Sequence, residues 1–467
     1  MTPERIGKFP NSQQSSTPLH QHSNTETMTN FKRYAIFLLH AILAQIFIAA
    51  LSVSGTNFAY GAVEYRWAGQ LRVIGEVSWP DHESLPQPVN TGPYYDGHGN
   101  FRLMNMTFFT PDAYFETHYE LIFSGGDTFQ KNKALEQRYP DLFKYGVLTS
   151  GILSNEISFF DFDKIIYEGD DYILYHRLDG FLLALQPNWG SVRIGRQALT
   201  WGNGLIFNPM DLLNPFAPTN FVRDYKVGED MIAAQLPVSN GGDIQFVYVP
   251  RRNPANGDVQ FDPSSLAGKL HVAAGTTEFD IMVAKDYTDQ VIGLGSAGYL
   301  KDAAWRLDAT YTFLDTNSSR DGFLSLVANM DYSWVWWEKN FYGLMEFYYN
   351  GLCNNQYSEE LADPDIIARL ARGQMFTLGR TYLNGSIEIE LHPLFNIYLT
   401  VINNLADPSG IIQPRAIWDV AENFQLTFGT NIAYGGEGTE FGGFKAPQTD
   451  FIIKSPDNAY VWVTYFF

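Results

Sequence analysis

The sequence has one cysteine, Cys353, so no intrachain disulfide can form. It is also poor in basic residues, because 31 Lys and Arg stand against 51 Asp and Glu, a formal net charge of -20. Nucleic-acid binding needs clustered Lys and Arg, so this balance argues against a nucleic-acid partner. After residue 53, no run approaches the ~18 apolar residues of a transmembrane helix. Any membrane crossing beyond that point must therefore use a barrel of strands.

Aromatic residues are abundant, yet the chain is not hydrophobic on average. The 467 residues are 45% hydrophobic and 15% aromatic, whereas the mean hydropathy is only -0.17. This combination is expected where apolar and polar residues alternate. No Pro- or Ser-rich linker divides the chain after residue 62, and no helical repeat occurs. A single domain over residues 62–467 is therefore predicted.

The N-terminal part differs from the rest. Residues 1–27 are polar and without periodicity, which predicts a disordered extension or a start codon assigned too far upstream. Two basic residues then precede an apolar run over residues 34–53, and small residues at 59–61 have the spacing of a cleavage site. We predict a secretory signal peptide over residues 28–61. The alternative is a retained transmembrane helix.

The remaining chain alternates with a period of two. Trp67, Leu71 and Val73 share one parity, while Arg66 and Arg72 share the other. Later alternating segments of ~10 residues have the length that crosses a bilayer at a tilt, whereas soluble strands average ~5–6 residues. They cover residues 303–315, 324–336 and 424–434. We predict an all-β fold, a single antiparallel transmembrane β-barrel of about 16 to 18 strands with long external loops.

One external loop is predicted to hold a short helix. Asp363 can cap it, Pro364 suits its first turn, and Gly373 can end it.

The chain ends on a strand without a polar tail. Phe467, Tyr465 and Val463 belong to one alternating apolar row, which a strand places on one face. This ending resembles the C-terminal signal of Gram-negative outer-membrane β-barrels, an alternating strand that ends in Phe. The resemblance implies that the barrel-assembly machinery recognises these residues. It also implies export through the cleaved signal peptide to the outer membrane, with outer-membrane lipid around the barrel.

A second distinctive stretch begins at Arg193 and reads RIGRQALTWGNGLIFNPMDLLNPF. Alternation stops at residues 201–204, and a loop with two Asn-Pro corners follows. Pro fixes φ and Asn can hydrogen-bond its own turn, so this loop is stiff. Its many apolar residues need a surface to pack on. The elements R-x-G-R-Q, W-G-x-G and F-N-P-x-D-x-x-N-P-F resemble a motif of porin-like proteins of Gram-negative outer membranes.

We expect this loop to fold into the lumen and to narrow it. Asp211 and Asp224 would then face basic wall residues, and the field between them would filter solutes by charge and size. The candidate wall residues are Arg193, Arg72 and Arg306. The alternative is that the loop only plugs or braces the barrel rim.

The predicted function is a channel for passive diffusion of small hydrophilic solutes or ions. The acidic chain predicts a weak preference for cations. The alternative is a barrel sleeve or conduit that houses a partner, such as a periplasmic cytochrome or an exported polysaccharide. A homo-oligomer is also compatible with the sequence, although no subunit interface can be recognised.

No enzyme, metal site or cofactor is predicted. The G-x-G-x-x-G match at residues 293–298 is followed by no βαβ unit, as nucleotide binding would require. Glu388, Glu390 and His392 share a strand face and could hold a divalent cation. A polar, water-filled lumen needs such residues in any case. Histidines are scattered and no G-x-S-x-G occurs, which argues against a hydrolase.

Overall fold

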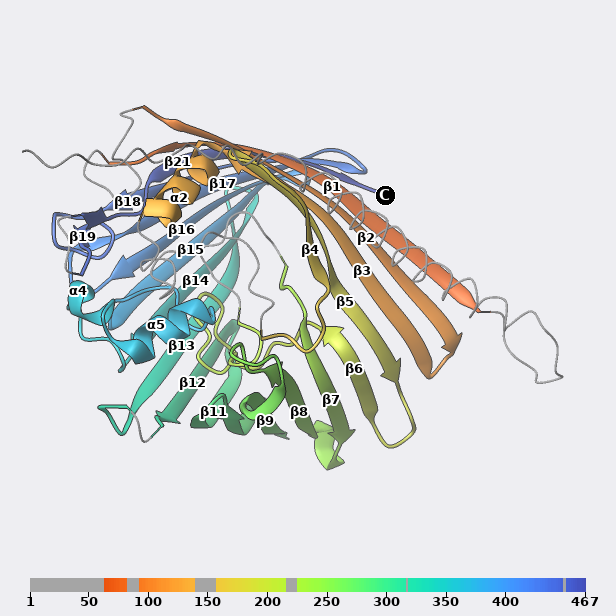
Figure 1. The fold of residues 1–467 in the computed structure, drawn as a ribbon. Helices are drawn as coiled ribbons and strands as arrows, with labels where there is room; N and C mark the ends of the chain where they lie inside the picture. Colours follow the sequence, from red (N-terminus) through yellow and green to blue (C-terminus); the bar gives the residue numbers. More distant parts are fainter. Residues whose placement is uncertain (1–62, 82–91, 139–156, 216–224, 316–317, 448–450) are drawn as a thin grey trace, which may run out of the picture. The chain divides into compact units, whose positions relative to one another are not determined.

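The computed structural model describes residues 63–81, 92–138, 157–215, 225–315, 318–447 and 451–467. Residues 64–467 form an antiparallel β-barrel in which eighteen wall strands close into a ring (Figure 1). The predicted N-terminal extension and signal peptide lie outside the described residues. In the described ranges, no helix has the length and hydrophobicity needed to cross a membrane.

The wall strands follow one another around the barrel in chain order. They are β1 (Glu64–Trp79), β2 (Tyr94–Thr110), β3 (Ala113–Gly126), β5 (Tyr172–Leu185), β6 (Ser191–Gln197), β7 (Glu229–Pro237), β8 (Asp243–Arg252), β9 (Val259–Ala274), β10 (Thr277–Asp286), β11 (Asp289–Leu300), β12 (Ala303–Phe313), β13 (Gly322–Trp336), β14 (Lys339–Asn350), β15 (Thr381–His392), β16 (Phe395–Asn404), β17 (Ser409–Ala421), β18 (Phe424–Tyr434) and β21 (Asp457–Phe466). The predicted fold class and strand number are thus confirmed.

The first and last strands close the ring. Gln70 of β1 is opposite Phe466 of β21, and Trp79 is opposite Asp457. Beyond this ladder, Gly69 and Phe467 exchange two backbone hydrogen bonds of 2.8 and 3.0 Å. The backbone groups that an open sheet would leave unpaired at these two strands are therefore satisfied, as hydrocarbon surroundings require.

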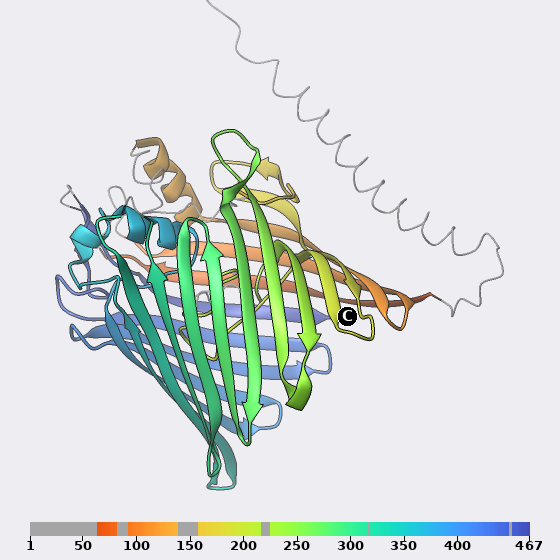
Figure 2. The same ribbon diagram turned by 90° about the horizontal axis from the view of Figure 1, so that it is seen from below.

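The two faces of the wall carry different side chains. Leu71 and Val73 are 47% and 54% exposed on the outside, whereas Arg72 between them is 3% exposed on the inside. Tyr465 of β21 and Phe467, which follows the last residue of that strand, are exposed in the same way. Figure 2 shows the strands tilted side by side across this wall. The alternation read from the sequence thus places apolar residues outside and polar residues inside.

At one end of the barrel every connection between wall strands has two to five residues, whereas the long connections all lie at the other end. Two residues join β11 to β12 and β17 to β18 at the first end. The other end carries the helices α2 (Asp127–Arg138), α4 (Tyr357–Glu360) and α5 (Pro364–Ala371). The predicted helix is confirmed in α5, where the Asp363 side chain accepts a hydrogen bond of 2.9 Å from the backbone N–H of Asp365.

Two elements of the β3–β5 connection were not predicted. They are the helix α2 and the short strand β4 (Asp163–Glu168). β4 pairs with β5 between Ile173 and Arg177, whereas β6 pairs with β5 only from Phe181 onward. β4 therefore occupies an edge of β5 that the shorter strand β6 does not reach.

Candidate functional site

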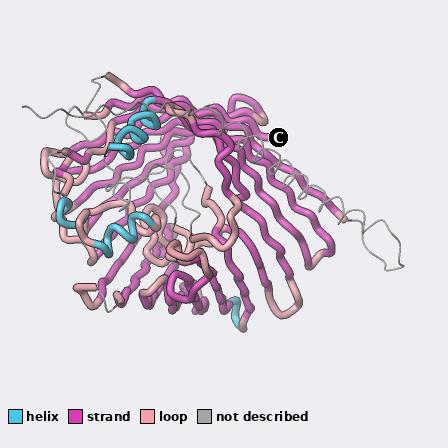
Figure 3. The backbone as a smooth tube through the Cα atoms, viewed as in Figure 1, coloured by secondary structure: helices cyan, strands magenta, loops and turns pink. Residues whose placement is uncertain are grey.

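The chain between β6 and β7, residues 198–228, forms what we call the inserted loop, described here for residues 198–215 and 225–228. Figure 3 shows loop segments inside the ring of strands. The inserted loop makes hydrogen bonds with inward-facing side chains of β8, β12, β13 and β14. It therefore folds into the barrel, as the apolar residues and Asn-Pro corners predicted.

Glu346 of β14 holds the centre of the inserted loop. Its carboxylate accepts backbone N–H bonds from Leu205 at 2.8 Å, Ile206 at 3.1 Å and Phe207 at 2.7 Å. The Glu346 side chain is 1% exposed. Three donors to one buried carboxylate satisfy most of its lone pairs, and hydrogen bonds to a charged group are stronger than neutral ones.

Asp308 of β12 holds the preceding turn. It accepts hydrogen bonds from the Asn203 backbone N–H at 2.5 Å and from the Asn203 side-chain amide at 2.7 Å. Asn329 of β13 donates to the carbonyl oxygen of Asn203 at 3.1 Å and to Glu346 at 3.3 Å. The two carboxylates are thus linked through Asn329 into one anchoring network across β12, β13 and β14.

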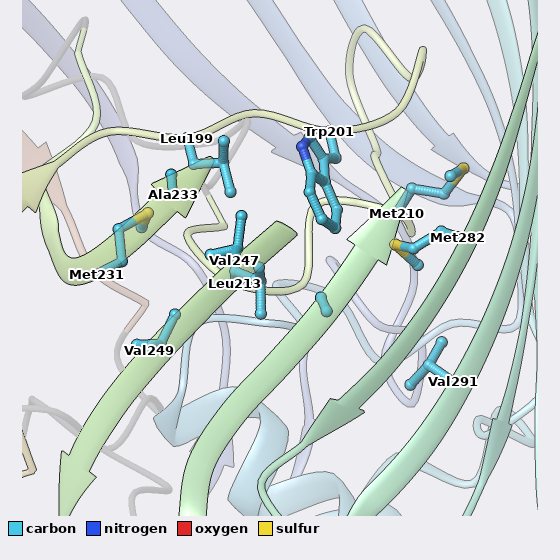
Figure 4. Packing of buried hydrophobic residues seen from close by; sticks show 11 residues of the cluster. Leu199, Trp201, Met210, Leu213, Met231, Ala233, Val247, Val249, Met282 and Val291 are labelled. Atoms are coloured by element: carbon cyan, nitrogen blue, oxygen red, sulfur yellow. The ribbon is translucent and has the colours of Figure 1, made fainter. Parts of the chain in front are cut away.

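Apolar side chains of the inserted loop pack on the wall beside this network. Trp201, Met210 and Leu213 are buried against the inner faces of β7 to β11 (Figure 4). The wall residues of this cluster are Met231, Ala233, Val247, Val249, Ala267, Met282 and Val291. The Trp201 indole N–H also donates to the side-chain oxygen of Gln245 at 2.7 Å. Removal of this apolar surface from water favours the folded-in position of the loop.

Phe207 packs on the opposite side of the loop. Its ring stacks on Tyr348 of β14 with centroids 4.5 Å apart and on Tyr382 of β15 with centroids 5.4 Å apart. Offset aromatic pairs add about 0.5–1.5 kcal/mol to the burial of their area. The anchored tripeptide 205–207 is therefore held by both its backbone and its aromatic side chain.

The two glycines of the W-G-x-G element permit the tight turn of the inserted loop at residues 201–204. Gly202 has φ +86°, which side chains disfavour. A Cβ at Gly204 would lie 1.9 Å from the carbonyl oxygen of Phe207. The Asn208 side chain donates to the carbonyl oxygen of Trp201 at 2.9 Å and closes the same turn. The sequence element that marked the end of alternation is thus the turn that brings the loop inward.

The β14–β15 connection approaches the inserted loop from the other side. Gln374 donates to the carbonyl oxygen of Leu212 at 3.3 Å and to Asp286 at 2.6 Å. A cavity of only about 40 Å³ separates the two segments and is lined by residues that include Asn208, Asp211 and Thr377. Little free space is left where these two connections meet.

The lumen wall of β2, β3, β5, β6 and β7 carries arginines that are paired with carboxylates. Nitrogen-oxygen distances are 2.6 Å for Arg102–Asp179, 2.6 Å for Arg177–Glu120 and 2.8 Å for Arg196–Asp230. All six side chains are buried. Such pairing offsets the cost of burying charge, so this part of the wall is ionic without a large net charge. The Tyr225 hydroxyl of the inserted loop also hydrogen-bonds to Glu120.

Asp211 and Asp224 were predicted to face basic wall residues. Asp211 is buried and forms an ion pair with Lys226 of the same loop. Burial raises the pKa of Asp211 to about 6, and the positive charge of Lys226 offsets part of this rise. The pairing within the loop differs from the expected pairing with the wall. Asp224 lies outside the described residues.

The three predicted wall arginines are not brought together. The Arg72 guanidinium lies 4.8 Å from the ring centroid of Trp462. Arg306 pairs with Asp331 of β13 and donates to Asn329 at 3.2 Å. Arg193 is half-buried on β6. A charge filter made of these residues stays a prediction.

The anchoring residues Glu346 and Asp308 were missed. Each is an acidic residue of inward parity in an otherwise apolar or aromatic strand. That parity was a usable signal for a lumen position, because the neighbouring residues Leu307 and Met345 face outward. The local sequence does not indicate that these two carboxylates accept hydrogen bonds from backbone N–H groups more than 100 residues away.

A closed eighteen-stranded antiparallel barrel with an apolar exterior, a polar interior and a loop folded inside is the fold of porin-like channels. Among solved structures, OccAB2 of Acinetobacter baumannii has this fold with a TM-score of 0.50 at 9% sequence identity, over 86% of this chain and 98% of that chain. A BenF-like porin from Pseudomonas fluorescens gives a TM-score of 0.47 at 10% identity, over 86% of this chain and 98% of that chain. OpdK of Pseudomonas aeruginosa, solved with vanillate, gives 0.48 at 9% identity with the same two coverages.

No protein-family model and no curated protein matches the sequence. At these identities the similarity concerns the fold. The porin-like architecture is thereby confirmed, whereas the family implied by the R-x-G-R-Q and W-G-x-G motif stays a prediction.

Proposed function

We propose that the protein is an outer-membrane channel for passive diffusion of small hydrophilic solutes or ions. The observation that carries the proposal is the opposite exposure of alternating wall residues, with Leu71 and Val73 outside and Arg72 inside. Such a wall is stable in hydrocarbon only when it is closed around a polar interior. The ring closure between β1 and β21 supplies this condition.

The inserted loop is the element that narrows the channel. It covers the inner faces of β7 to β11 through its apolar cluster and reaches β14 and β15 through Phe207. A solute must therefore pass between this loop and the uncovered part of the wall. The excess of acidic residues supports a weak preference for cations.

The proposal is tested with purified mature protein in planar lipid bilayers. Single-channel conductance is measured first in symmetric KCl, and the reversal potential is then measured in a KCl gradient. Discrete conductance steps with a reversal potential of cation-preferring sign support the proposal. A bilayer that stays non-conducting overturns the channel, whereas an anion-preferring reversal potential overturns only the selectivity.

The alternative function is a sleeve that houses a partner protein or polysaccharide inside the barrel. The interior already holds residues 198–215 of the same chain, which leaves less room for a second protein. A stoichiometric partner that co-purifies with the barrel would favour the sleeve.

A further inference from the structure

A polar patch lies on the inner wall formed by β15 to β18, and we call it the β15–β18 patch. Its members are inward-facing, half-buried side chains that can hydrogen-bond a solute. They are Ser386, Glu388, Tyr398, Thr400, Gln413, Arg415 and Asn431.

The patch lies next to the anchor of the inserted loop. Glu346 of β14 is opposite Asn384 of β15, and Asn384 is opposite Ile402 of β16. Side chains two residues further along a strand point to the same face. Ser386, opposite Thr400, is therefore the next inward position of β15 beyond the anchor, on the side of the β15–β16 tight turn.

Four members of the patch are neutral and paired with one another. The hydroxyl oxygens of Ser386 and Thr400 are 2.9 Å apart, and the Gln413 amide donates to the Asn431 side-chain oxygen at 2.8 Å. Each hydroxyl has one donor and two acceptor sites, and each amide has two donors. The Asn431 amide also donates to the Asn458 side-chain oxygen at 2.8 Å, and capacity for hydrogen bonds to a solute is left over after these internal bonds.

The charged members of the patch compensate each other. Glu388 accepts a hydrogen bond of 3.0 Å from the Tyr398 hydroxyl, and the Arg415 guanidinium lies 4.8 Å from the Tyr398 ring centroid. One positive and one negative group thus contact the same tyrosine, and the carboxylate of Asp419 on β17 also acts on it. An anionic solute drawn to Arg415 would also meet Glu388, so this arrangement favours a solute without net charge.

An unused hydrogen-bonding group stands between the patch and the anchor. Asn384 is 1% exposed, and neither its amide nitrogen nor its amide oxygen has a hydrogen-bond partner within the described part of the chain. A buried amide without partners is costly and calls for an explanation. At 1% exposure Asn384 borders the patch as a polar neighbour and is not itself open to a solute.

We propose that the β15–β18 patch binds a neutral, hydroxyl-rich solute of monosaccharide size as it passes the inserted loop. Adjacent strands are ~4.8 Å apart, and same-face residues of one strand are ~6.7 Å apart. The polar groups therefore form a grid on the scale of the hydroxyls around a sugar ring. This inference rests on the proposed channel function and adds the class of solute.

The test compares inhibition of the single-channel KCl current by glucose and by glucuronate, which share the pyranose ring and differ at C6, where glucuronate carries a carboxylate. Wild-type protein is expected to be inhibited at lower concentrations of glucose than of glucuronate. The double substitution Q413A and N431A should weaken glucose inhibition about fivefold for each hydrogen bond removed, with inhibition expressed relative to the KCl conductance of the same protein without sugar. T430A is the matched control, because Thr430 is adjacent to Asn431 and has the outward parity of Phe428.

A second variant separates charge from hydrogen bonding. E388Q removes the carboxylate that shares Tyr398 with Arg415 and should lower the glucuronate concentration needed for inhibition. Stronger inhibition by glucuronate than by glucose in wild type, or unchanged glucose inhibition in the double variant, overturns the inference while the channel stands. Absence of any conductance overturns the proposed function and this inference together.

Discussion

The carboxylate of Glu346 accepts a hydrogen bond of 2.7 Å from the backbone N–H of Phe207, which joins the wall strand β14 to the centre of the inserted loop. The two residues are 139 positions apart in the chain. This contact converts a surface connection between β6 and β7 into an element of the lumen. It also fixes the position of the loop, so that substitutions at this contact should free the loop from the wall.

E346Q should loosen the inserted loop. Three backbone N–H groups donate to Glu346. The carboxylate receives them with two oxygens, whereas a carboxamide has only one. We therefore expect the attachment of the loop to weaken by about 2–3 kcal/mol. Single-channel recordings should show a larger and noisier conductance. E388Q removes a lumen carboxylate whose hydrogen bond is to a wall residue and is the control for loss of charge alone. Equal current noise in E346Q and E388Q would argue against the role of Glu346 in holding the loop.

F207A should weaken the same attachment from the apolar side. Phe207 is 4% exposed and stacked on two tyrosines, and truncation of a buried Phe costs about 3–5 kcal/mol. We expect a lower thermal unfolding temperature in detergent and a rise in conductance. L205A is the matched control, because Leu205 is 47% exposed in the same loop. A Phe207 variant no less stable than the Leu205 variant would contradict this packing.

G204A should disrupt the turn that sends the loop inward. The added Cβ would lie 1.9 Å from a backbone oxygen, which cannot move aside as a flexible side chain can. We expect a lower unfolding temperature and heterogeneous conductance levels. Gly436, where an added Cβ meets nothing within 4 Å, provides the control G436A. A G204A protein that matches G436A in both readouts would count against the turn.

Asp211 should stabilise the fold more at acidic pH than at neutral pH. Its pKa is raised to about 6 in the folded protein, against about 3.9 for an unperturbed Asp. The folded state therefore binds the proton more tightly, and the free energy of unfolding rises as the pH falls from about 6 to about 4. This gain, up to roughly 2–3 kcal/mol, is lost as the pH rises through 6.

Thermal unfolding of wild type and D211N between pH 4 and pH 7 checks this expectation. As the pH falls, the unfolding temperature of wild type should rise relative to that of D211N. D258N, at the exposed Asp258, is the control for a general effect of removing a carboxylate. A difference that is independent of pH, or that shifts toward D211N in acid, would be incompatible with a raised pKa.

The fold could be predicted because a barrel wall repeats one local rule along each strand. The parity of Leu71, Arg72 and Val73 alone separates outside from inside, and the Asn-Pro corners with their apolar neighbours indicate a packed loop. The partners of that loop could not be predicted, because barrel curvature decides which wall residues it meets. Asp211 was assigned a partner across the lumen, whereas Lys226 of the same loop lies beside it. Local rules therefore predicted the wall and the direction of the loop, but not its contacts.

The most direct test of the account is the single-channel conductance of a variant in which residues 205–219 are replaced by a short Gly-Ser linker. The deletion removes the tripeptide held by Glu346 together with Met210 and Leu213 of the apolar cluster, while the strand pairing of the wall is left intact. We predict a severalfold rise in conductance over wild type in the same bilayer and salt. A folded, detergent-soluble variant whose conductance equals that of wild type would show that the inserted loop does not narrow the channel.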